Sequence, residues 1–199
     1  MLAGCSSVYK NLQPATGDIN DLQKFKPDFR KVLYKAEIDV VGHHLSGLLF
    51  IKTLPDSTIR DSTIRMVFST ETGFKFFDFG FGPDGGFKVF YVVKQMNKKA
   101  VIKTLKKDFE LILLPQKDYK SAYLRKDDSN LYYIFPRPKG TFCYITDLKS
   151  TEMKIMEISS PYKPIVQAIA KGAPNGIPDT IGISHKNFNF TIGLKKIDR

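Results

Sequence analysis

The sequence contains no tryptophan and only two cysteines and three histidines among its 199 residues. Two cysteines, Cys5 and Cys143, are too few for a disulfide-stabilised scaffold, so we expect an apolar core to hold the fold. Cys143 lies in an apolar, strand-like stretch and is predicted to be a buried, unreactive thiol. No run of about 18 apolar residues occurs, so no segment is typical of a membrane-spanning helix. At this length a single domain can bury a sizeable core.

Acidic residues are also scarce: 20 Asp and Glu stand against 31 Lys and Arg, and the formal net charge is +11. Such a charge can reflect binding to nucleic acid, attraction to an anionic membrane surface, or solubility alone. The lysines are scattered, densest at 94–107, and no arginine-rich or RNA-binding motif is present. We therefore predict that nucleic acid is not a partner, and an anionic lipid surface and a solvated basic face remain as alternatives.

Neither a metal site nor an active site is indicated. His43 and His44 are adjacent, and adjacent side chains of a strand point to opposite faces, so both cannot readily bind one metal ion. Ser46 and Asp39 lie near them, but no nucleophile elbow and no pair of catalytic carboxylates supports a hydrolase. The glycine-rich stretch 80–86 has no capped helix after it that could bind phosphate. We predict a protein that is not an enzyme, with no catalytic residue, metal or cofactor.

Residues 2–5 have the sequence Leu-Ala-Gly-Cys, which resembles the lipobox of bacterial lipoproteins. The resemblance implies that Cys5 carries acyl groups such as palmitate, and each buried methylene adds roughly 0.8 kcal/mol to membrane anchoring. A signal peptide would have a charged start and an apolar stretch of about 7–15 residues before the box, whereas Met1 directly precedes it here. We expect a lipobox and polar tether at 1–17; the alternative is an ordinary apolar N-terminus.

From residue 31 onward, apolar and polar residues alternate with period two, which is the pattern of half-buried strands. Proline- and glycine-containing turns separate these runs, while the apolar segment 165–170 stays unassigned. The short connections favour a single antiparallel sheet that curls, with about 10–11 strands. The expected strands are 31–40, 45–51, 64–68, 74–81, 87–93, 119–125, 131–135, 141–145, 153–158, 177–183 and 188–197.

One long helix is predicted at 97–114, capped by Asn97, and a short one at 18–25. The strands at 74–81 and 87–93 carry apolar residues on both faces, which a solvated sheet face would not do. We therefore expect the long helix to cover one face of this sheet. The helical residues expected to make this contact are Val101, Leu105 and Phe109.

This arrangement resembles the LolA/LolB-like lipoprotein-localisation superfamily over residues 18–197. The matching features are the short helix at 18–25, the first hairpin around 42–47, the inserted helix at 97–114 and the last strand at 188–197. The resemblance implies a mainly β protein with an inserted helix (α+β): a curved, unclosed antiparallel β-barrel with a covering helix. It further implies a single half-barrel domain at 18–199, in an outer-membrane lipoprotein of Gram-negative type on the periplasmic face.

In that superfamily an apolar concave cavity holds the acyl chains of a lipid or lipoprotein, and burial of such chains is favourable by about 25 cal/mol per Å². The implied function is acyl-chain binding in envelope lipid or lipoprotein trafficking. A barrel core uses the same residue types, so a structural or accessory outer-membrane lipoprotein, its cavity filled by its own helix, is the alternative. The residues expected to line the cavity are Phe74, Phe76, Phe87, Val89, Tyr91, Val101, Leu105 and Phe109.

The outer-membrane receptor branch also has an exposed apolar residue on the loop between its third and fourth strands. Here that connection is the polar turn 70–73, and the nearest apolar candidate, Leu54, lies one loop earlier. The resemblance therefore implies lipid binding without implying that this chain inserts lipoproteins into a membrane.

Overall fold

A computed structural model describes residues 8–40, 42–55, 62–83, 85–114, 121–172 and 176–197. The strands of the first half are β2 (Lys31–Val40), β3 (His43–Pro55), β4 (Ser62–Ser69), β5 (Lys75–Phe81) and β6 (Phe87–Val92). Those of the second half are β7 (Tyr123–Lys126), β8 (Asn130–Arg137), β9 (Gly140–Asp147), β10 (Met153–Ser159), β11 (Pro164–Lys171), β12 (Thr180–His185) and β13 (Phe190–Lys196). A two-residue strand, β1 (Gln13–Pro14), precedes both halves.

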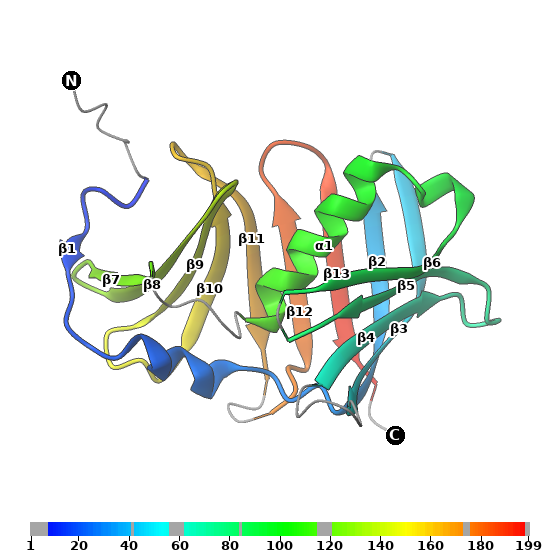
Figure 1. Ribbon diagram of the computed structural model, residues 1–199, viewed down its shortest axis with the longest axis horizontal. Helices are drawn as coiled ribbons and strands as arrows, with labels where there is room; N and C mark the ends of the chain where they lie inside the picture. Colours follow the sequence, from blue (N-terminus) through cyan, green and yellow to red (C-terminus); the bar gives the residue numbers. More distant parts are fainter. Residues whose placement is uncertain are drawn as a thin grey trace.

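These strands form one 13-stranded sheet in the order β1-β7-β8-β9-β10-β11-β12-β13-β2-β3-β4-β5-β6. Each half is a meander of antiparallel neighbours, and the last strand returns to pair with β2, from Phe190↔Val40 to Lys196↔Tyr34. The sheet curls around a single long helix, α1 (Lys99–Leu113), and β1 and β6 remain as separate edges (Figure 1). The predicted fold class, a curved and unclosed antiparallel sheet with a covering helix, is confirmed.

The structure contains more strands than the 10–11 expected, because β1 and β11 were not assigned from the sequence. β11 covers the apolar segment 165–170, whose composition fits a buried helix as well as a strand. Its register with β12 is regular, from Val166↔His185 to Lys171↔Thr180. Pairing with its neighbours, which the sequence pattern does not show, therefore decides that this segment is a strand.

The helices differ only in detail from the prediction. A 3-10 helix, η1 (Ile19–Phe25), begins at Asp18, whose side chain accepts a hydrogen bond from the Asn20 backbone N–H at 2.8 Å. The long helix begins one residue later than expected, because Asn97 ends the short 3-10 turn η2 (Lys94–Met96) with its N–H bonded to Lys94. Lys98, without a side-chain cap, is the N-cap residue of α1.

Residues 8–12 belong to the segment 1–17, which the sequence predicts to be a lipobox and polar tether; in the structure they pack against the convex face as an N-terminal strap that leads into β1. Tyr9 is only 5 % exposed and joins a small apolar cluster with Ile134 and Cys143 of β8 and β9. Its hydroxyl donates to Glu157 Oε2 at 3.2 Å and lies 2.8 Å from Ser159 Oγ. The packing of Tyr9 could not be predicted, because this segment has only a few apolar side chains among polar ones. The lipobox at residues 2–5 lies outside the described residues.

The core lies between the concave face of the sheet and α1. The inward positions of the central strands are almost all apolar, as in Val32, Tyr34, Ala36 and Ile38 of β2, and the outward positions mix polar side chains with apolar ones such as Leu33 and Phe50. Cys143 faces the strap rather than α1; it is wholly buried, and burial raises the pKa of its thiol well above the ordinary range. The prediction of a buried free thiol is confirmed.

Candidate functional site: the concave face and its helix

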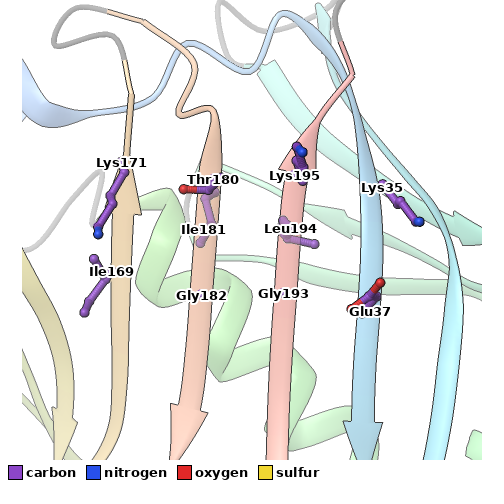
Figure 2. Close-up of a pocket in the computed structure, with 10 residues that line it drawn as sticks. All are labelled: Lys35, Glu37, Ile169, Lys171, Thr180, Ile181, Gly182, Gly193, Leu194 and Lys195. Atoms are coloured by element: carbon purple, nitrogen blue, oxygen red, sulfur yellow. The ribbon is translucent and has the colours of Figure 1, made fainter.

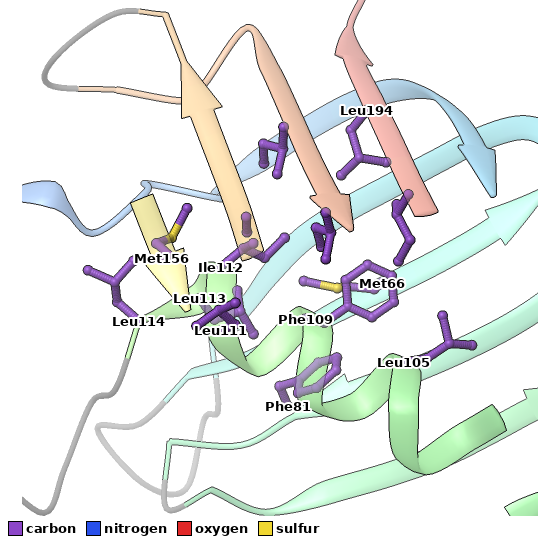
Figure 3. Packing of buried hydrophobic residues seen from close by; sticks show 14 of the residues in the cluster. Met66, Phe81, Leu105, Phe109, Leu111, Ile112, Leu113, Leu114, Met156 and Leu194 are labelled. Carbon is purple, nitrogen blue, oxygen red and sulfur yellow. The ribbon is translucent and has the colours of Figure 1, made fainter. Parts of the chain in front are cut away.

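Helix α1 fills the hollow of the curved sheet. Its side chains Leu105 and Phe109 are fully buried, and the Phe109 ring lies 5.8 Å from Phe77 and 6.3 Å from Phe81, centroid to centroid. Figure 3 shows Leu105, Phe109 and Ile112 pointing from the helix into the sheet, among Met66, Phe81 and Leu194. Where α1 lies, the concave face is therefore occupied by the protein's own side chains.

The floor of this site is aromatic. Phe77 and Phe79 stack with centroids 4.5 Å apart, and Phe79 meets Phe87 of the edge strand at 5.3 Å. Phe68 of β4 packs against Phe77 at 5.5 Å, and all of these residues except Phe87 are 0 % exposed. Such a surface offers a large apolar area without a buried polar group that would require a partner.

The eight cavity residues expected from the sequence fall into two groups. Five pack into the core: Phe76 and Phe87 from the sheet, and Val101, Leu105 and Phe109 from α1. The other three are exposed, with exposed fractions of 54 % for Phe74, 38 % for Val89 and 42 % for Tyr91. A bulge between Asp78 and Phe79 sets Tyr91 opposite Asp78, on the convex side, where Lys75 Nζ lies 5.7 Å from its ring.

Sequence reasoning missed the central floor residues Phe77, Phe79 and Phe81. At β5 the sequence pattern favoured the even-numbered aromatics Phe74 and Phe76. In the structure, a register shift after Phe68 directs the odd-numbered aromatics of β5 toward α1. Asp78 provides the signal that could have found them, because a carboxylate between these residues must point away from an apolar cavity. On the convex face Asp78 receives two hydrogen bonds from Arg65, at 2.8 and 2.9 Å.

A polar pair connects α1 to the sheet inside this apolar surrounding. His185 Nε2 of β12 lies 3.0 and 3.1 Å from the two carboxylate oxygens of Asp108, and their side chains are 6 % and 0 % exposed. Burial raises the pKa of the Asp108 carboxyl, and the hydrogen bond from His185 opposes part of that rise. The rings of Phe188 and Phe190 pack on His185 at 4.6 and 4.9 Å. We call Asp108 and His185 the α1 latch.

Local sequence does little to stabilise α1. Its N-cap residue makes no side-chain hydrogen bond, its first turn has no acidic residue and its last turn has no basic one. These features leave the helix dipole uncompensated. At its end, Leu114 has φ 56°, a left-handed conformation that is unfavourable for leucine. Packing and the α1 latch, rather than capping of its ends, therefore hold the helix in place.

Groups that could perform other chemistry do not gather within the described residues. No three His, Cys, Asp or Glu side chains of that part of the chain could hold a metal ion. His44 Nδ1 lies 2.7 Å from Asp39 Oδ1 at the surface, while His43 is exposed nearby. None of the helices in the described ranges has the length and apolar character that crossing a membrane requires.

Comparison with known proteins adds a likeness of fold. The sequence matches no protein-family model and no curated protein. Among solved structures, an outer membrane lipoprotein-sorting protein domain from Vibrio parahaemolyticus aligns over 90 % of both chains with TM-score 0.51 and 9 % identity. A LolA superfamily protein from Nitrosomonas europaea (90 % of both chains, TM-score 0.44, 8 % identity) and a DUF1329 family protein from Desulfovibrio piger (86 % of this chain and 85 % of that one, 0.42, 7 %) also align. The chain shares the fold of the Vibrio parahaemolyticus domain, a likeness in line with the fold that the sequence resemblance predicted.

Proposed function

We propose that this protein is a non-enzymatic acyl-chain carrier of the cell envelope, and that the acyl chain of a lipid or lipoprotein binds on the concave face in place of part of α1. The observation that carries this proposal is the way α1 occupies that face. An amphipathic helix with uncompensated ends covers a continuous aromatic floor, so moving the helix exposes an apolar surface that an acyl chain can cover again.

Binding would occur by exchange: an acyl chain would replace part of α1 on the concave face, so no open cavity is needed. Displacing α1 would expose Phe77, Phe79 and Phe81 to water, and an acyl chain laid on these rings would restore the lost apolar contact. The elements that move on ligand binding are drawn from the less stable parts of a fold, and the uncompensated ends of α1 are where its opening would begin. The LolA-like fold agrees with this role, and the neighbour described as a lipoprotein-sorting domain motivates the ligand class.

A second candidate is an anchored structural subunit in which α1 never leaves the concave face. The complete burial of Leu105, Phe109 and Leu111 favours it, because these side chains already satisfy the apolar floor. The α1 latch favours it too, since opening the helix would separate a buried hydrogen-bonded pair. Acyl-chain binding by the intact protein distinguishes the two candidates.

The wild-type protein is expected to bind a fluorescent fatty acid at micromolar concentration, and Phe76→Ala is expected to weaken that binding about tenfold. Phe76 stacks on Phe68 at 4.9 Å at the rim of the floor and has no ring contact with α1 in the described structure, so its truncation removes ligand contact without unlocking the helix. Fluorescence titration measures this effect. Tyr162→Ala, at a residue 80 % exposed, is the matched control and should bind as wild type does. A wild-type protein that binds no acyl probe would leave the structural subunit as the function.

The finer localisation is also a proposal: Cys5 anchors the chain by lipidation to the outer membrane, on the periplasmic face. The lipobox at residues 2–5 supports it. Two or three acyl chains supply enough buried methylene groups for stable anchoring, whereas a single chain binds reversibly.

We expect the full-length protein to sediment with membranes and Cys5→Ser to move it to the soluble fraction, because the Cys5 sulfur is the atom that would carry the diacylglycerol. Fractionation after a high-salt wash measures this, since the wash removes attraction due to the +11 charge alone. Cys143→Ser, at the other cysteine, is the matched control. Retention of the Cys5→Ser protein in the washed membranes would contradict the anchor.

A further inference from the structure

The convex face carries a groove that the proposed function does not use. It has a volume of about 570 Å³ and lies over β11, β12, β13 and β2, on the side of the sheet opposite α1 (Figure 2). Its floor is formed by Gly182 of β12 and Gly193 of β13, which face each other in the sheet. Ile169 of β11 and Glu37 of β2 stand at the two sides of this glycine floor, in register with it.

The two glycines of the floor are not required by the fold. Both have ordinary extended backbone, and a Cβ added to Gly182 would meet no atom within 4 Å, while one on Gly193 would meet only the Glu37 carbonyl oxygen at 4.0 Å. Elsewhere the chain uses glycine from steric need, as at Gly47, where a Cβ would lie 2.2 Å from the Ser69 carbonyl oxygen. Glycine within a strand is destabilising and often marks a place where a ligand approaches the backbone closely.

One end of the groove is cationic. The residues next to the glycine floor form a row across four strands: Lys35 pairs with Lys195, which pairs with Thr180, which pairs with Lys171. The Lys35–Lys195 pair places two like charges directly opposite each other, an arrangement that destabilises a sheet. None of these three lysines has an ion-pair partner among the described residues. By contrast, their neighbour Lys196 is paired with Asp179.

The chain thus keeps two unfavourable features side by side, an unneeded glycine floor and an uncompensated lysine row, and a bound anion would account for both. We propose that this groove binds a phosphate ester, with the phosphate against the lysine row and the body of the ligand on the glycine floor. Lysine ammonium groups bind phosphate as point charges and can approach it from several sides. Opposite walls on β11 and β2 are about 14 Å apart, which is wide enough for a headgroup or a small ring.

Glu37 narrows the class of ligand. Glu37 lies two residues along β2 from Lys35, about 7 Å in an extended strand. Its carboxylate would repel a second anionic group of the ligand and accept a hydrogen bond from a donor group. A phosphate ester with a hydroxyl or an amine at that distance, such as a glycerol or ethanolamine phosphate, satisfies both ends of the groove. The same chemistry occurs in a free phosphate ester and in a phospholipid headgroup, and the experiment separates these sources.

The test uses the full-length protein and three probes: glycerol 3-phosphate, inorganic phosphate, and phosphatidylcholine vesicles that contain phosphatidylglycerol. We expect calorimetric titration to show binding of glycerol 3-phosphate that Gly182→Val and Lys195→Gln each weaken by about tenfold or more. A valine side chain at position 182 would occupy the open space of the groove without a clash, and valine favours a strand more than glycine does. The melting temperature of the Gly182→Val protein should therefore be unchanged or higher. Lys149→Gln, at an exposed lysine of the β9–β10 turn, is the matched control and should bind as wild type.

The outcomes separate cleanly. Binding of the soluble ester identifies a free phosphate ester, whereas binding of the vesicles alone identifies a lipid headgroup, and in either case Gly182→Val must weaken the binding by about tenfold or more. If the wild type binds none of the probes, or if Gly182→Val binds them as well as wild type, the proposal is overturned. Glycerol 3-phosphate has no acyl chain and the groove lies on the face opposite α1, so its binding does not depend on whether the concave face binds acyl chains. Binding to vesicles counts for the groove only where Gly182→Val weakens it, because the concave face and a lipid on Cys5 are unchanged in that variant.

Discussion

Replacing Phe109 with alanine is expected to lower the free energy of unfolding by about 3–5 kcal/mol. The side chain is 0 % exposed and lies between Phe77 and Phe81, so its removal leaves a cavity between α1 and the sheet. If α1 occupies the acyl-chain site, the same cavity gives a ligand room without full displacement of the helix. A fluorescent fatty acid should then bind Phe109→Ala more tightly than wild type, while urea unfolding shows the loss of stability.

These opposite effects on stability and affinity distinguish a carrier from a plain core. Tyr162→Ala, at the most exposed of the large apolar side chains, should change stability by no more than about 0.5 kcal/mol and leave probe binding unchanged. A Phe109→Ala protein that loses stability and still binds no acyl probe would show that the site is core alone.

Breaking the α1 latch is expected to have a similarly large effect. His185→Ala leaves the Asp108 carboxyl 0 % exposed and without the imidazole that now binds both of its oxygens. Leaving a buried polar group without its hydrogen-bond partner costs about 1–3 kcal/mol, and more where that group is charged. Chemical unfolding at neutral pH should show this loss. Replacing both partners with apolar residues, as in Asp108→Leu with His185→Phe, should cost much less, because no buried polar group is then left without a partner.

The loss from His185→Ala should depend on pH. Burial raises the pKa of Asp108, and the substitution removes the hydrogen bond that partly opposes this rise. A carboxyl whose pKa is higher in the folded than in the unfolded protein binds its proton more tightly when folded. The variant is therefore most stable below the pKa of the unfolded carboxyl and loses stability as the pH rises through the folded pKa. The difference between variant and wild type should shrink in acid; an equal difference at acidic and neutral pH would contradict the role of Asp108.

The fold class could be predicted from the sequence because its main signals are local. Alternation such as Tyr34, Ala36 and Ile38 identifies a half-buried strand wherever the strand lies, and the two-sided aromatic strands require a cover. Neither β1 nor β11 could be assigned in this way. For β11 the pattern is ambiguous, and the docking of Tyr9 depends on Glu157 and Ser159, about 150 positions away in the chain.

The candidate site could be predicted in part for the same reason. Leu105 and Phe109 were identified by helical spacing, which is a property of α1 alone. The inward aromatics of β5 were not, because the register shifts after Phe68 and before Phe79 depend on pairing with the neighbouring strands. The α1 latch was missed since 77 positions separate its members, and neither residue type is distinctive in its own segment. The convex groove was invisible too, because it requires glycines from two different strands to face each other.

Docking of the N-terminal strap has a mechanical consequence for an anchored protein. Cys5 and Tyr9 are four positions apart, and an extended chain spans at most about 3.6 Å per residue, so no more than about 14 Å of backbone can separate an acylated cysteine from the buried Tyr9. Tyr9 is fixed on β8 to β10, at the opposite end of the sheet from β6 (Figure 1). A lipid on Cys5 would therefore attach the domain rigidly and at short range. It would hold the β8 to β10 end of the sheet near the bilayer, and the β6 edge would face away from the membrane.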